Sequence, residues 1–319
     1  MKRVLILGVT GQDGQLLADQ LIKKGHSVLG ISRNLPNWDS NPLKLSRPKY
    51  CALDVFDYKA LRDLIKDFQP SEIYNLSGES SVAISFSNVA LTIDSNVIGA
   101  LNLLNAVQEL RFQKKIRIFQ ATSSDMFGPS EVKLSEISLL APVSPYGISK
   151  FSVYQICKLY REEFGLWISS GILFNHESEL RSAKFVFQKV IKSLVEIKQS
   201  KREVLELGNL DIRRDWGYAG DYVDAMQRCL EFDHPRDFVI ATGKLHSLRN
   251  LIEKSCDYLD LRMPIESLVK IDSSLKRALD INCTWGDPEN ARNLLGWTAS
   301  TTFDEIVAKL VRFNLKSTG

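Results

Sequence analysis

Short apolar runs alternate with helix-like patterns over the first half of the chain. Runs typical of buried strands lie at residues 4–7, 26–31, 51–54, 73–76, 116–119 and 167–174. Between them, apolar residues recur every three or four positions at 16–22, 61–68, 96–110 and 146–164, as on one face of a helix. This alternation predicts an α/β fold, in which a doubly wound parallel sheet has helices on both faces.

The regular alternation ends near Phe174, and the sequence beyond it is less regular. We therefore expect a sheet domain at 1–174 and a second domain formed mainly by 175–319. Ligands of open parallel sheets bind at the carboxyl ends of the strands, so residues that follow predicted strands are the first candidates for a site. These residues are Gly8, Arg33, Asp54, Ser77 and Ser123.

A glycine-rich turn, Gly8-Val9-Thr10-Gly11-Gln12-Asp13-Gly14, joins the first predicted strand to the first predicted helix. Its glycines allow a tight turn, close approach of backbone N–H groups to a pyrophosphate, and close packing of the helix. A glycine-rich turn without a ligand is the alternative. The strand before the turn and the helix after it favour a dinucleotide site.

The second predicted strand ends in Ser32-Arg33-Asn34. Dinucleotide-binding folds that prefer NAD place an acidic residue here, on the ribose hydroxyls. A cation at Arg33 instead suits the additional phosphate of NADP, although a surface arginine at a strand end is the alternative interpretation. We predict NADP as the cofactor.

Four candidate catalytic residues lie between residues 116 and 150. Ser123 and Asp125 follow a predicted strand, and Tyr146 and Lys150 are one helical turn apart at the start of a predicted helix. A phenol is a poor base at neutral pH, so we expect the Lys150 ammonium to lower the pKa of Tyr146. Tyr146 would then take a hydroxyl proton from a substrate as hydride leaves the carbon.

A second pair with the same spacing, Tyr154 and Lys158, lies on the same predicted helix. The spacing alone is therefore weak evidence for catalysis. Tyr146 is favoured because it follows Pro145 at the helix start, where a side chain can face a cleft at the strand ends. Tyr154 and Lys158 are expected on a packing or subunit-contact face.

The composition narrows the class of protein. With 319 residues, 44% hydrophobic and 25% charged, the chain can form one large core or two modest ones. A net charge of +3 is too small and dispersed to indicate nucleic-acid binding. The five cysteines lack metal-like spacing, and no apolar run reaches the length of a signal peptide or membrane span. We expect a cytoplasmic protein with free thiols, no metal and no membrane attachment.

Several motifs together resemble a known family. Ser123, Tyr146 and Lys150 match the triad of the extended short-chain dehydrogenases/reductases, which use nicotinamide cofactors on nucleotide sugars. More specifically, the chain resembles the GDP-mannose 4,6-dehydratases in residues 10–14, 171–178, 207–211, 214–217 and 295–297. The resemblance covers essentially the whole chain. It implies a Rossmann-type sheet with a smaller, interleaved C-terminal substrate domain, so that about 211–243 would rejoin the NADP-binding domain.

The resemblance also implies roles for individual residues. The cofactor would be bound by Gly8, Thr10, Gly11, Gln12, Asp13, Gly14, Arg33, Asp54, Val55, Leu76, Tyr146, Lys150, His176 and Arg181. The nucleotide-diphosphate sugar would be bound by Ser85, Ser124, Asn175, Lys189, Arg214 and Arg277. As cations from different segments, Arg181, Lys189, Arg214 and Arg277 could share a diphosphate, although each alone is typical of a solvated surface charge.

Asp125 is the departure from the family pattern with most mechanistic weight. The family has a Glu at this position, which removes the proton from C5 of the sugar. Asp is shorter by one C–C bond, about 1.5 Å, and misplacement of that order can cost roughly a hundredfold in rate. Further departures are Asn34, Glu79, Glu179, Phe187, Gln188 and Ala278.

The predicted activity is conversion of GDP-mannose to GDP-4-keto-6-deoxymannose by internal hydride transfer, with Ser123, Asp125, Tyr146 and Lys150 as catalytic residues. A reductase or epimerase that acts only at C4 is the first alternative, because it needs no base at C5. A non-catalytic NADP(H)-binding protein is the alternative from another class, against which Tyr146 and Lys150 argue.

The predicted helix at 146–164 is rich in large side chains. It carries Phe151, Tyr154, Cys157, Leu159 and Tyr160, more apolar surface than one sheet face is expected to absorb. Members of the family that this chain resembles pair through such a helix, so we expect a homodimer or homotetramer.

Overall fold

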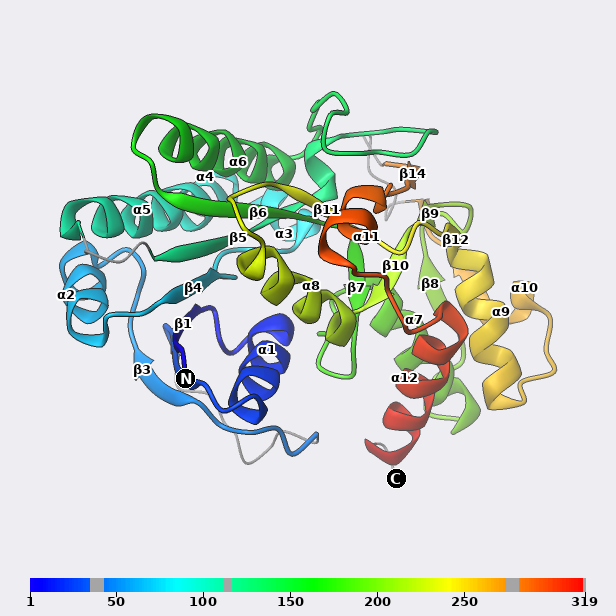
Figure 1. Ribbon diagram of the computed structural model, residues 1–319. Coiled ribbons are helices and arrows are strands. Elements are labelled where there is room, and N and C mark those ends of the chain that lie inside the picture. Colours follow the sequence, from blue (N-terminus) through cyan, green and yellow to red (C-terminus); the bar gives the residue numbers. More distant parts are fainter. Residues whose placement is uncertain (35–42, 112–115, 274–280, 318–319) are drawn as a thin grey trace.

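A seven-stranded parallel sheet is the centre of the computed structural model, which describes residues 1–34, 43–111, 116–273 and 281–317 (Figure 1). The strand order is β11-β6-β5-β4-β1-β2-β3. These strands are β1 (Arg3–Leu7), β2 (Ser27–Ser32), β3 (Lys49–Ala52), β4 (Glu72–Asn75), β5 (Arg117–Ser123), β6 (Trp167–Leu173) and β11 (Phe238–Ile240). The predicted parallel sheet is confirmed, and the six predicted strands differ from the observed ones by a few residues at their ends.

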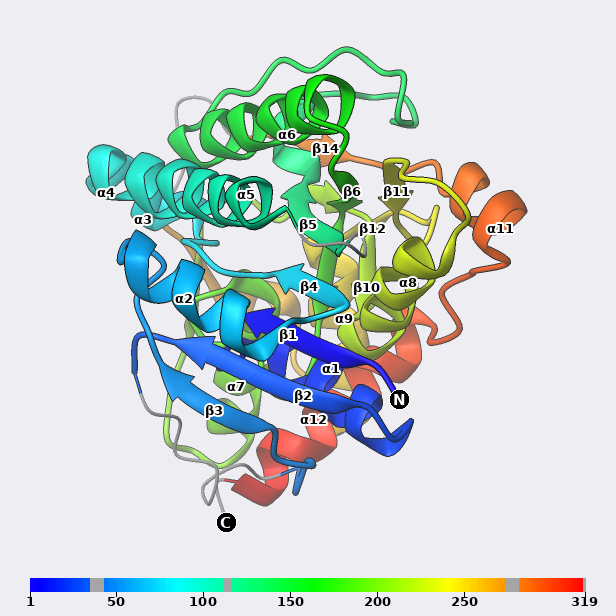
Figure 2. The same cartoon turned by 60° about the vertical axis from the view of Figure 1, so that its left-hand side comes forward.

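Helices cover both faces of the sheet. They are α1 (Gln12–Lys23), α2 (Tyr58–Phe68), α5 (Gly99–Leu110), α6 (Pro145–Glu163) and α8 (Ala219–Glu231). Val4 and Ile6 of β1 pack with α1 and α8, whereas Leu5 and Leu7 pack with α2, α5 and α6. Figures 1 and 2 show the two groups of helices on opposite sides of the sheet. Because both faces are covered, the strands are apolar on both sides, which explains their continuous apolar runs.

A second lobe, on the right in Figure 1, has its own core. Its helices are α7 (Val186–Lys198), α9 (Leu248–Leu259), α10 (Ile265–Leu268) and α12 (Phe303–Ser317), and α11 (Glu289–Leu295) lies beside β11. Its short strand pairs are β7 (Asn175–Glu177) with β10 (Trp216–Tyr218) and β8 (Leu205–Leu207) with β13 (Val269–Ile271). A third group consists of β12 (His246–Ser247), β9 (Arg213–Arg214) and β14 (Cys283–Thr284).

The chain passes between the two lobes more than once. After β6 it enters the second lobe, and it returns as α8 and β11, of which β11 pairs with β6. It then leaves the sheet again for α9 and the C-terminal helices. The sheet and the second lobe are therefore interleaved in sequence.

Most of the apolar surface of α6 is absorbed inside the fold, contrary to the expectation from the sequence. Cys157 and Tyr160 are buried against the sheet, and Phe151 and Tyr154 pack against a small cluster around Met126. The sequence interpretation counted only the sheet face and missed this second cluster. Of the five residues, Leu159 remains exposed.

A continuous helix runs from Val89 to Leu110 through α4 (Val89–Ile93), a π-helical turn η2 (Asp94–Ile98) and α5. By length and composition alone it could cross a membrane, a test that core helices of soluble proteins also pass. The expectation that no segment approaches a membrane span is therefore wrong for this helix, because the sequence interpretation began it only at Asn96. Its C-terminal part packs on the sheet through Leu103, Leu104 and Val107.

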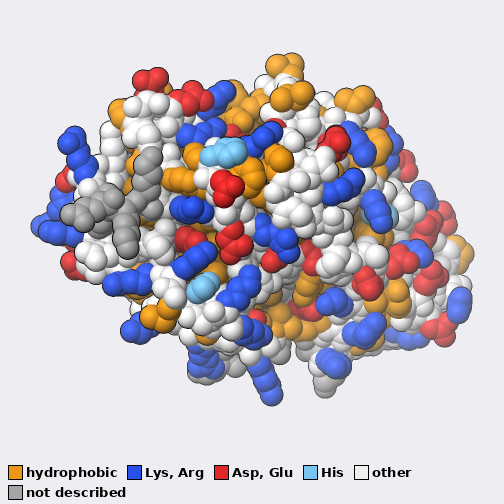
Figure 3. Space-filling view, viewed as in Figure 1, with side chains coloured by type: hydrophobic (Ala, Val, Ile, Leu, Met, Phe, Trp, Pro, Cys, Tyr) orange, Lys and Arg blue, Asp and Glu red, His pale blue; other side chains and the backbone are white. Residues whose placement is uncertain are grey.

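Surface charge is mixed. Figure 3 shows Lys and Arg side chains spread among Asp and Glu on the face seen in Figure 1. This distribution agrees with the small net charge of +3.

Candidate active site

The glycine-rich turn after β1 folds tightly against the end of β4. Gly8 has a φ of +81°, and a Cβ built there would lie 2.7 Å from the Leu76 carbonyl oxygen. A Cβ on Gly14 would lie 2.5 Å from the Gly8 carbonyl oxygen, so α1 begins directly against the turn. In the described part of the chain, no side chain caps the start of α1 at Gly11. This helix start is open to an anion, so the turn fits the pyrophosphate of a dinucleotide.

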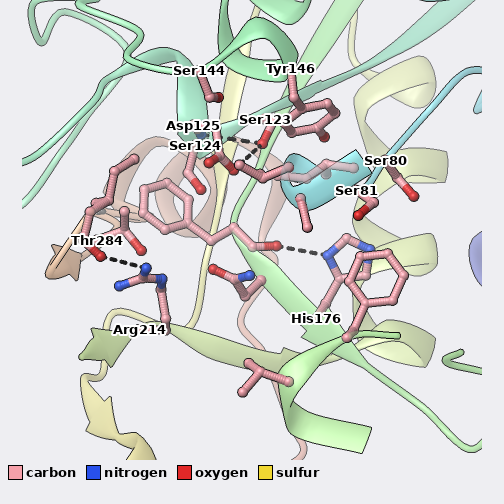
Figure 4. Close-up of a pocket in the computed structure, with 18 of the residues that line it drawn as sticks. Ser80, Ser81, Ser123, Ser124, Asp125, Ser144, Tyr146, His176, Arg214 and Thr284 are labelled. Carbon is pink, nitrogen blue, oxygen red and sulfur yellow. Dashed lines mark hydrogen bonds between the residues drawn. The ribbon is translucent and has the colours of Figure 1, made fainter. Parts of the chain in front are cut away.

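A pocket of about 460 Å³ lies between the carboxyl edge of the sheet and the second lobe (Figure 4). Twelve of the predicted site residues line it: Asp13, Leu76, Ser123, Ser124, Asp125, Tyr146, Lys150, Asn175, His176, Arg181, Lys189 and Arg214. The fold thus gathers residues from α1, β5, α6, β7 and the second lobe around one cavity. A volume of this size suits a small-molecule ligand.

The other predicted cofactor residues lie along the sheet edge outside this lining. Gly8, Thr10, Gly11, Gln12 and Gly14 form the turn and the start of α1. Arg33 follows β2 and is exposed, and Asp54 and Val55 follow β3. All of these residues lie at carboxyl ends of parallel strands or directly after them, where a dinucleotide would extend away from the pocket.

Two predicted substrate residues are not in the pocket lining. Ser85 lies on α3 (Val82–Ser87), is fully buried, and donates its hydroxyl to the Val82 carbonyl oxygen at 2.7 Å. The prediction that Ser85 contacts substrate is therefore wrong for this structure, because the helix turns that side chain inward. Arg277, together with the departure Ala278, lies outside the described residues.

Ser123, Tyr146 and Lys150 meet where β5 ends and α6 begins. Ser144 caps α6 by accepting from the Gly147 N–H at 3.0 Å, and Pro145 occupies the first helical position. Tyr146 is thereby placed in the first turn, where it lines the same pocket as Ser123. The Lys150 Nζ donates to the Ala121 carbonyl oxygen at 3.2 Å and lies 5.8 Å from the centre of the Tyr146 ring.

The pKa of Tyr146 differs from the expectation. Burial and the nearby carboxylate of Asp125 raise the pKa of Tyr146 well above its usual value, and the hydrogen bond from Ser123 and the charge of Arg181 only partly oppose this. Burial also lowers the pKa of Lys150 to about 8. The prediction that Lys150 lowers the pKa of Tyr146 is therefore wrong for the protein alone, because burial penalises both charged forms.

Asp125 is joined directly to Ser123. The Ser123 hydroxyl donates to Asp125 Oδ2 at 3.1 Å, and the Asp125 backbone N–H donates to Ser123 Oγ at 3.2 Å. Tyr146 lines the same pocket beside this pair (Figure 4). The pocket therefore holds two potential bases, the phenol of Tyr146 and the carboxylate of Asp125.

Arg181 follows β7, lines the pocket and is held by two neighbours. Its Nε lies 3.5 Å from Glu177 Oε2, and its guanidinium carbon lies 3.4 Å from the centre of the Phe185 ring. Lys184, Lys189 and Arg214 also line the pocket. Such a set of cations from separate segments suits a diphosphate.

The pocket also contains residues that the sequence interpretation missed. They are Ser80, Ser81, Lys184, Phe185, Asn209 and Thr284. Ser80 and Ser81 follow the β4 strand, and this position at a strand end was the one signal that could have identified them. The others come from the second lobe, where no strand-end rule applies.

Two departures from the family pattern lie in the core of the second lobe and do not line the pocket. Phe187 is fully buried and packs edge to face against Trp216 at 5.4 Å. Gln188 is buried beside Asn314. These two departures therefore do not contact a ligand in the pocket directly, because α7 turns both side chains toward its own core. Glu79 accepts from the N–H groups of Ser80 and Ser81 and so shapes the pocket rim.

A parallel Rossmann-type sheet with a Ser-Tyr-Lys group at its carboxyl edge defines the class of extended short-chain dehydrogenases/reductases. A family model described as GDP-mannose 4,6 dehydratase matches residues 5–310. The chain belongs to the GDP-mannose 4,6-dehydratase family.

Curated relatives agree with this assignment. GDP-mannose 4,6 dehydratase of Homo sapiens is 36% identical over 338 residues, covering 98% of this chain and 91% of the relative. GDP-mannose 4,6-dehydratase of Vibrio cholerae is 34% identical over 350 residues, covering 99% of this chain and 94% of the relative. The similarity thus extends over both lobes.

Solved structures show the same fold at lower identity. A UDP-glucose 4-epimerase from Thermotoga maritima, solved with UDP-glucose, has a TM-score of 0.84 at 20% identity and covers 99% of this chain and 100% of its own. RMD from Pseudomonas aeruginosa, complexed with NADPH, has a TM-score of 0.83 at 22% identity, with coverage of 99% and 100%. At these identities the likeness shows the fold.

We predict that replacing Lys150 by Met stabilises the protein at neutral pH. The pKa of Lys150 is lowered in the folded state, so its charge opposes folding below about pH 8, and this penalty vanishes as the pH rises toward 10.5. Lys150→Met should raise the free energy of unfolding by on the order of 1–2 kcal/mol near pH 7, and the gain should disappear near pH 10. Denaturant unfolding of wild type and variant at both pH values measures this difference in the free energy of unfolding.

Lys158→Met is the matched control, because Lys158 is exposed on the same helix. It should change the free energy of unfolding by less than about 0.5 kcal/mol at either pH. A Lys150→Met protein that is less stable than wild type near neutral pH would contradict the prediction.

Proposed function

We propose that this chain is an NADP-dependent nucleotide-sugar 4,6-dehydratase, a lyase that converts GDP-mannose to GDP-4-keto-6-deoxymannose. One observation carries the proposal. The phenol of Tyr146 and the carboxylate of Asp125 line a single pocket, together with the Ser123 hydroxyl that donates to Asp125. A dehydratase needs two such bases, one for the C4 hydroxyl and one for C5.

The chain's own residues supply the proton transfers. Tyr146 removes the proton of the C4 hydroxyl while Ser123 holds the C4 oxygen by a hydrogen bond. The resulting 4-ketone acidifies C5, and Asp125 takes that proton. The C6 hydroxyl then leaves as water with the proton that Asp125 returns, and the proton held by Tyr146 balances the return of a proton to C5 when C6 is reduced. A bound nicotinamide cofactor supplies a hydride acceptor for C4 and a hydride donor for C6, so no net oxidant is consumed.

Four cations that line the pocket support a nucleotide diphosphate as part of the substrate. Lys184, Lys189 and Arg214 approach the cavity from the second lobe, and Arg181 approaches it from the segment after β7. Their four positive charges suit two phosphates. GDP-mannose is the substrate that the relatives' names support.

An enzyme that acts only at C4, as a reductase or epimerase, is the second candidate. The observation that favours it is the hydrogen bond from Ser123 to Asp125 Oδ2. This bond holds the short Asp125 side chain toward β5, whereas a longer carboxylate would reach further into the cavity. Both candidates need Tyr146, Lys150 and Ser123.

Asp125 separates the two candidates. Supplied with GDP-mannose, the wild type should form the 4-keto-6-deoxy product without consuming added NADPH. Asp125→Asn should lower this rate by about a hundredfold or more, because C5 loses its base. Asp125→Glu, which restores reach, should retain activity. Product formation is followed by mass spectrometry and NADPH by its absorbance.

Ser130→Ala is a suitable control, because Ser130 lies on the exposed loop after the site and outside the pocket lining. The C4 reductase would be favoured over the dehydratase by two results together. These are stoichiometric loss of NADPH with a 4-keto sugar nucleotide and no product from GDP-mannose. Equal rates for wild type and Asp125→Asn would remove Asp125 from the mechanism.

NADP is the proposed cofactor, supported by the exposed cation Arg33 after β2. A charge-assisted contact to the 2′-phosphate contributes about 1.5–3 kcal/mol, roughly a ten- to hundredfold preference over NAD. Asn34, in place of a second arginine, should keep the preference near the lower end. Titration of both oxidised cofactors should show selective loss of NADP affinity in Arg33→Ala but not in Arg236→Ala, an exposed control. Equal wild-type affinities would refute the assignment.

We propose that the chain forms a homodimer or homotetramer through α4 and α6, which pack against each other. Exposed apolar residues on these helices and the adjoining turn are Val89, Leu91, Ile98, Ile148 and Leu159. Sedimentation near 10 μM should show an oligomer, and Leu91→Glu with Ile148→Glu should give monomers, because the charges would be desolvated at the interface. Ile271→Glu, exposed in the second lobe, is the control. A monomeric wild type would overturn this proposal.

The cytoplasm is the proposed location. All five cysteines are free, which supports a reducing compartment.

A further inference from the structure

The first turn of α1 carries a carboxylate beside the site proposed for the cofactor's pyrophosphate. Asp13 follows Gln12 in the first turn of α1, and its Oδ2 lies 2.9 Å from His176 Nε2. The start of a helix attracts anions, and a bound pyrophosphate would bring further negative charge to the same place. Asp13 would therefore repel the ligand unless a cation offsets it.

His176 is placed so that both of its ring nitrogens face acceptors. Nδ1 lies 2.7 Å from the Phe174 carbonyl oxygen, which can only accept (Figure 4). Nε2 faces the Asp13 carboxylate on the other side. Two acceptors are matched only by a ring that carries both protons, which is the imidazolium.

Further contacts agree with a positive ring. His176 stacks on the buried ring of Tyr222 in α8, with centroids 4.5 Å apart, and an aromatic face attracts a cation. Burial lowers the pKa of His176, but the charge and hydrogen bond of Asp13 outweigh it, so the pKa is raised overall. The same pair holds the pKa of Asp13 below its usual value although burial acts in the other direction.

Other ionisable groups surround the pair. Arg181 and Glu177 lie on the same segment as His176, and Tyr146 and Lys150 of α6 interact electrostatically with Asp13. Arg181 opposes the charge of the ring, so the imidazolium depends on Asp13 for its stability. Asp13 and His176 are therefore coupled to each other more directly than to the rest of the site.

We propose that His176 is held as an imidazolium that offsets the charge of Asp13 at the cofactor-binding start of α1, so that affinity for the oxidised dinucleotide falls when His176 loses its proton. His176 is then a positioning residue that sets the charge at the helix start. The inference rests on the proposed binding of a nicotinamide dinucleotide. The inference explains why an acidic residue, Asp13, is tolerated beside the proposed site of the anionic pyrophosphate.

The direction of the pH effect follows from linkage. Below the raised pKa of His176, the ring is charged and Asp13 is compensated, so the anionic cofactor binds well. As the pH rises through that value, the ring becomes neutral and the Asp13 charge remains. Affinity should therefore fall with rising pH, by up to about tenfold for a coupling of the usual size.

The experiment measures the dissociation constant of oxidised NADP on the full-length protein between about pH 7 and pH 9.5, where the 2′-phosphate, whose pKa is about 6, is at least about 90% ionised. Wild type should lose affinity across this range. His176→Gln should bind about tenfold more weakly near pH 7 and lose the pH dependence. Adding Asp13→Asn to His176→Gln should restore the affinity, because the uncompensated charge is gone.

Two controls separate this effect from other titrations. His234→Gln, at an exposed histidine outside the pocket lining, should keep the wild-type pH profile. Lys150, whose pKa is about 8, also titrates in this range, so Lys150→Met should retain the part of the profile due to His176. The imidazole resonances of His176 give a readout without cofactor, and its pKa should fall in Asp13→Asn.

The outcomes distinguish the inference from the function on which it rests. NADP binding that is independent of pH in wild type, or a double variant no better than His176→Gln, overturns the charge-offset role and leaves the dehydratase intact. An unchanged His176 pKa in Asp13→Asn also overturns it. If neither NADP nor NAD binds, the charge-offset role and the proposed NADP-dependent function are both overturned.

Discussion

The parallel pairing of β1, β4, β5 and β6 is the constraint on which the site depends. Leu7 of β1 pairs with Asn75 of β4, and Ser123 of β5 pairs with Leu173 of β6, so all four strands end at one edge. The glycine-rich turn, Ser123 and β7 each follow one of these strands. A shift in register would move the turn away from the Ser123 hydroxyl, because consecutive residues along a strand are about 3.3 Å apart.

The site concentrates ionisable groups in buried positions, and burial opposes the charge of each one. Tyr146, Lys150, His176 and Glu177 are all buried. Burial raises the pKa of Tyr146 and Glu177, and it lowers that of Lys150. Burial also lowers the pKa of His176, but Asp13, which faces it at 2.9 Å, outweighs burial and raises the pKa overall. A site of this kind is less stable than an apolar one would be, and its charges become useful when a ligand supplies the missing partners.

Polar contacts join the two lobes at the pocket. Gln12 of α1 donates to the His176 carbonyl oxygen at 3.2 Å and accepts from the Ser178 hydroxyl at 2.8 Å. Asp215 accepts from the N–H groups of Thr242 and Gly243, which follow β11, at 2.8 Å each. The Gln12 bonds connect the glycine-rich turn to the segment after β6 that lines the pocket. The two sides of the pocket are therefore held together by hydrogen bonds and the partly buried Asp13–His176 pair as well as by apolar packing.

The sequence by itself determined the parallel sheet, the glycine-rich turn and the group of Ser123, Tyr146 and Lys150, because these follow from local periodicity and from residues at the ends of strands. Only the tertiary structure decided which distant side chains reach the pocket. Ser85 and Gln188 turn into cores, whereas Lys184 and Thr284 line the cavity. The sign of the Tyr146 pKa shift was also decided there, because burial and the Asp125 carboxylate act through space and leave no mark in the spacing of residues along the chain.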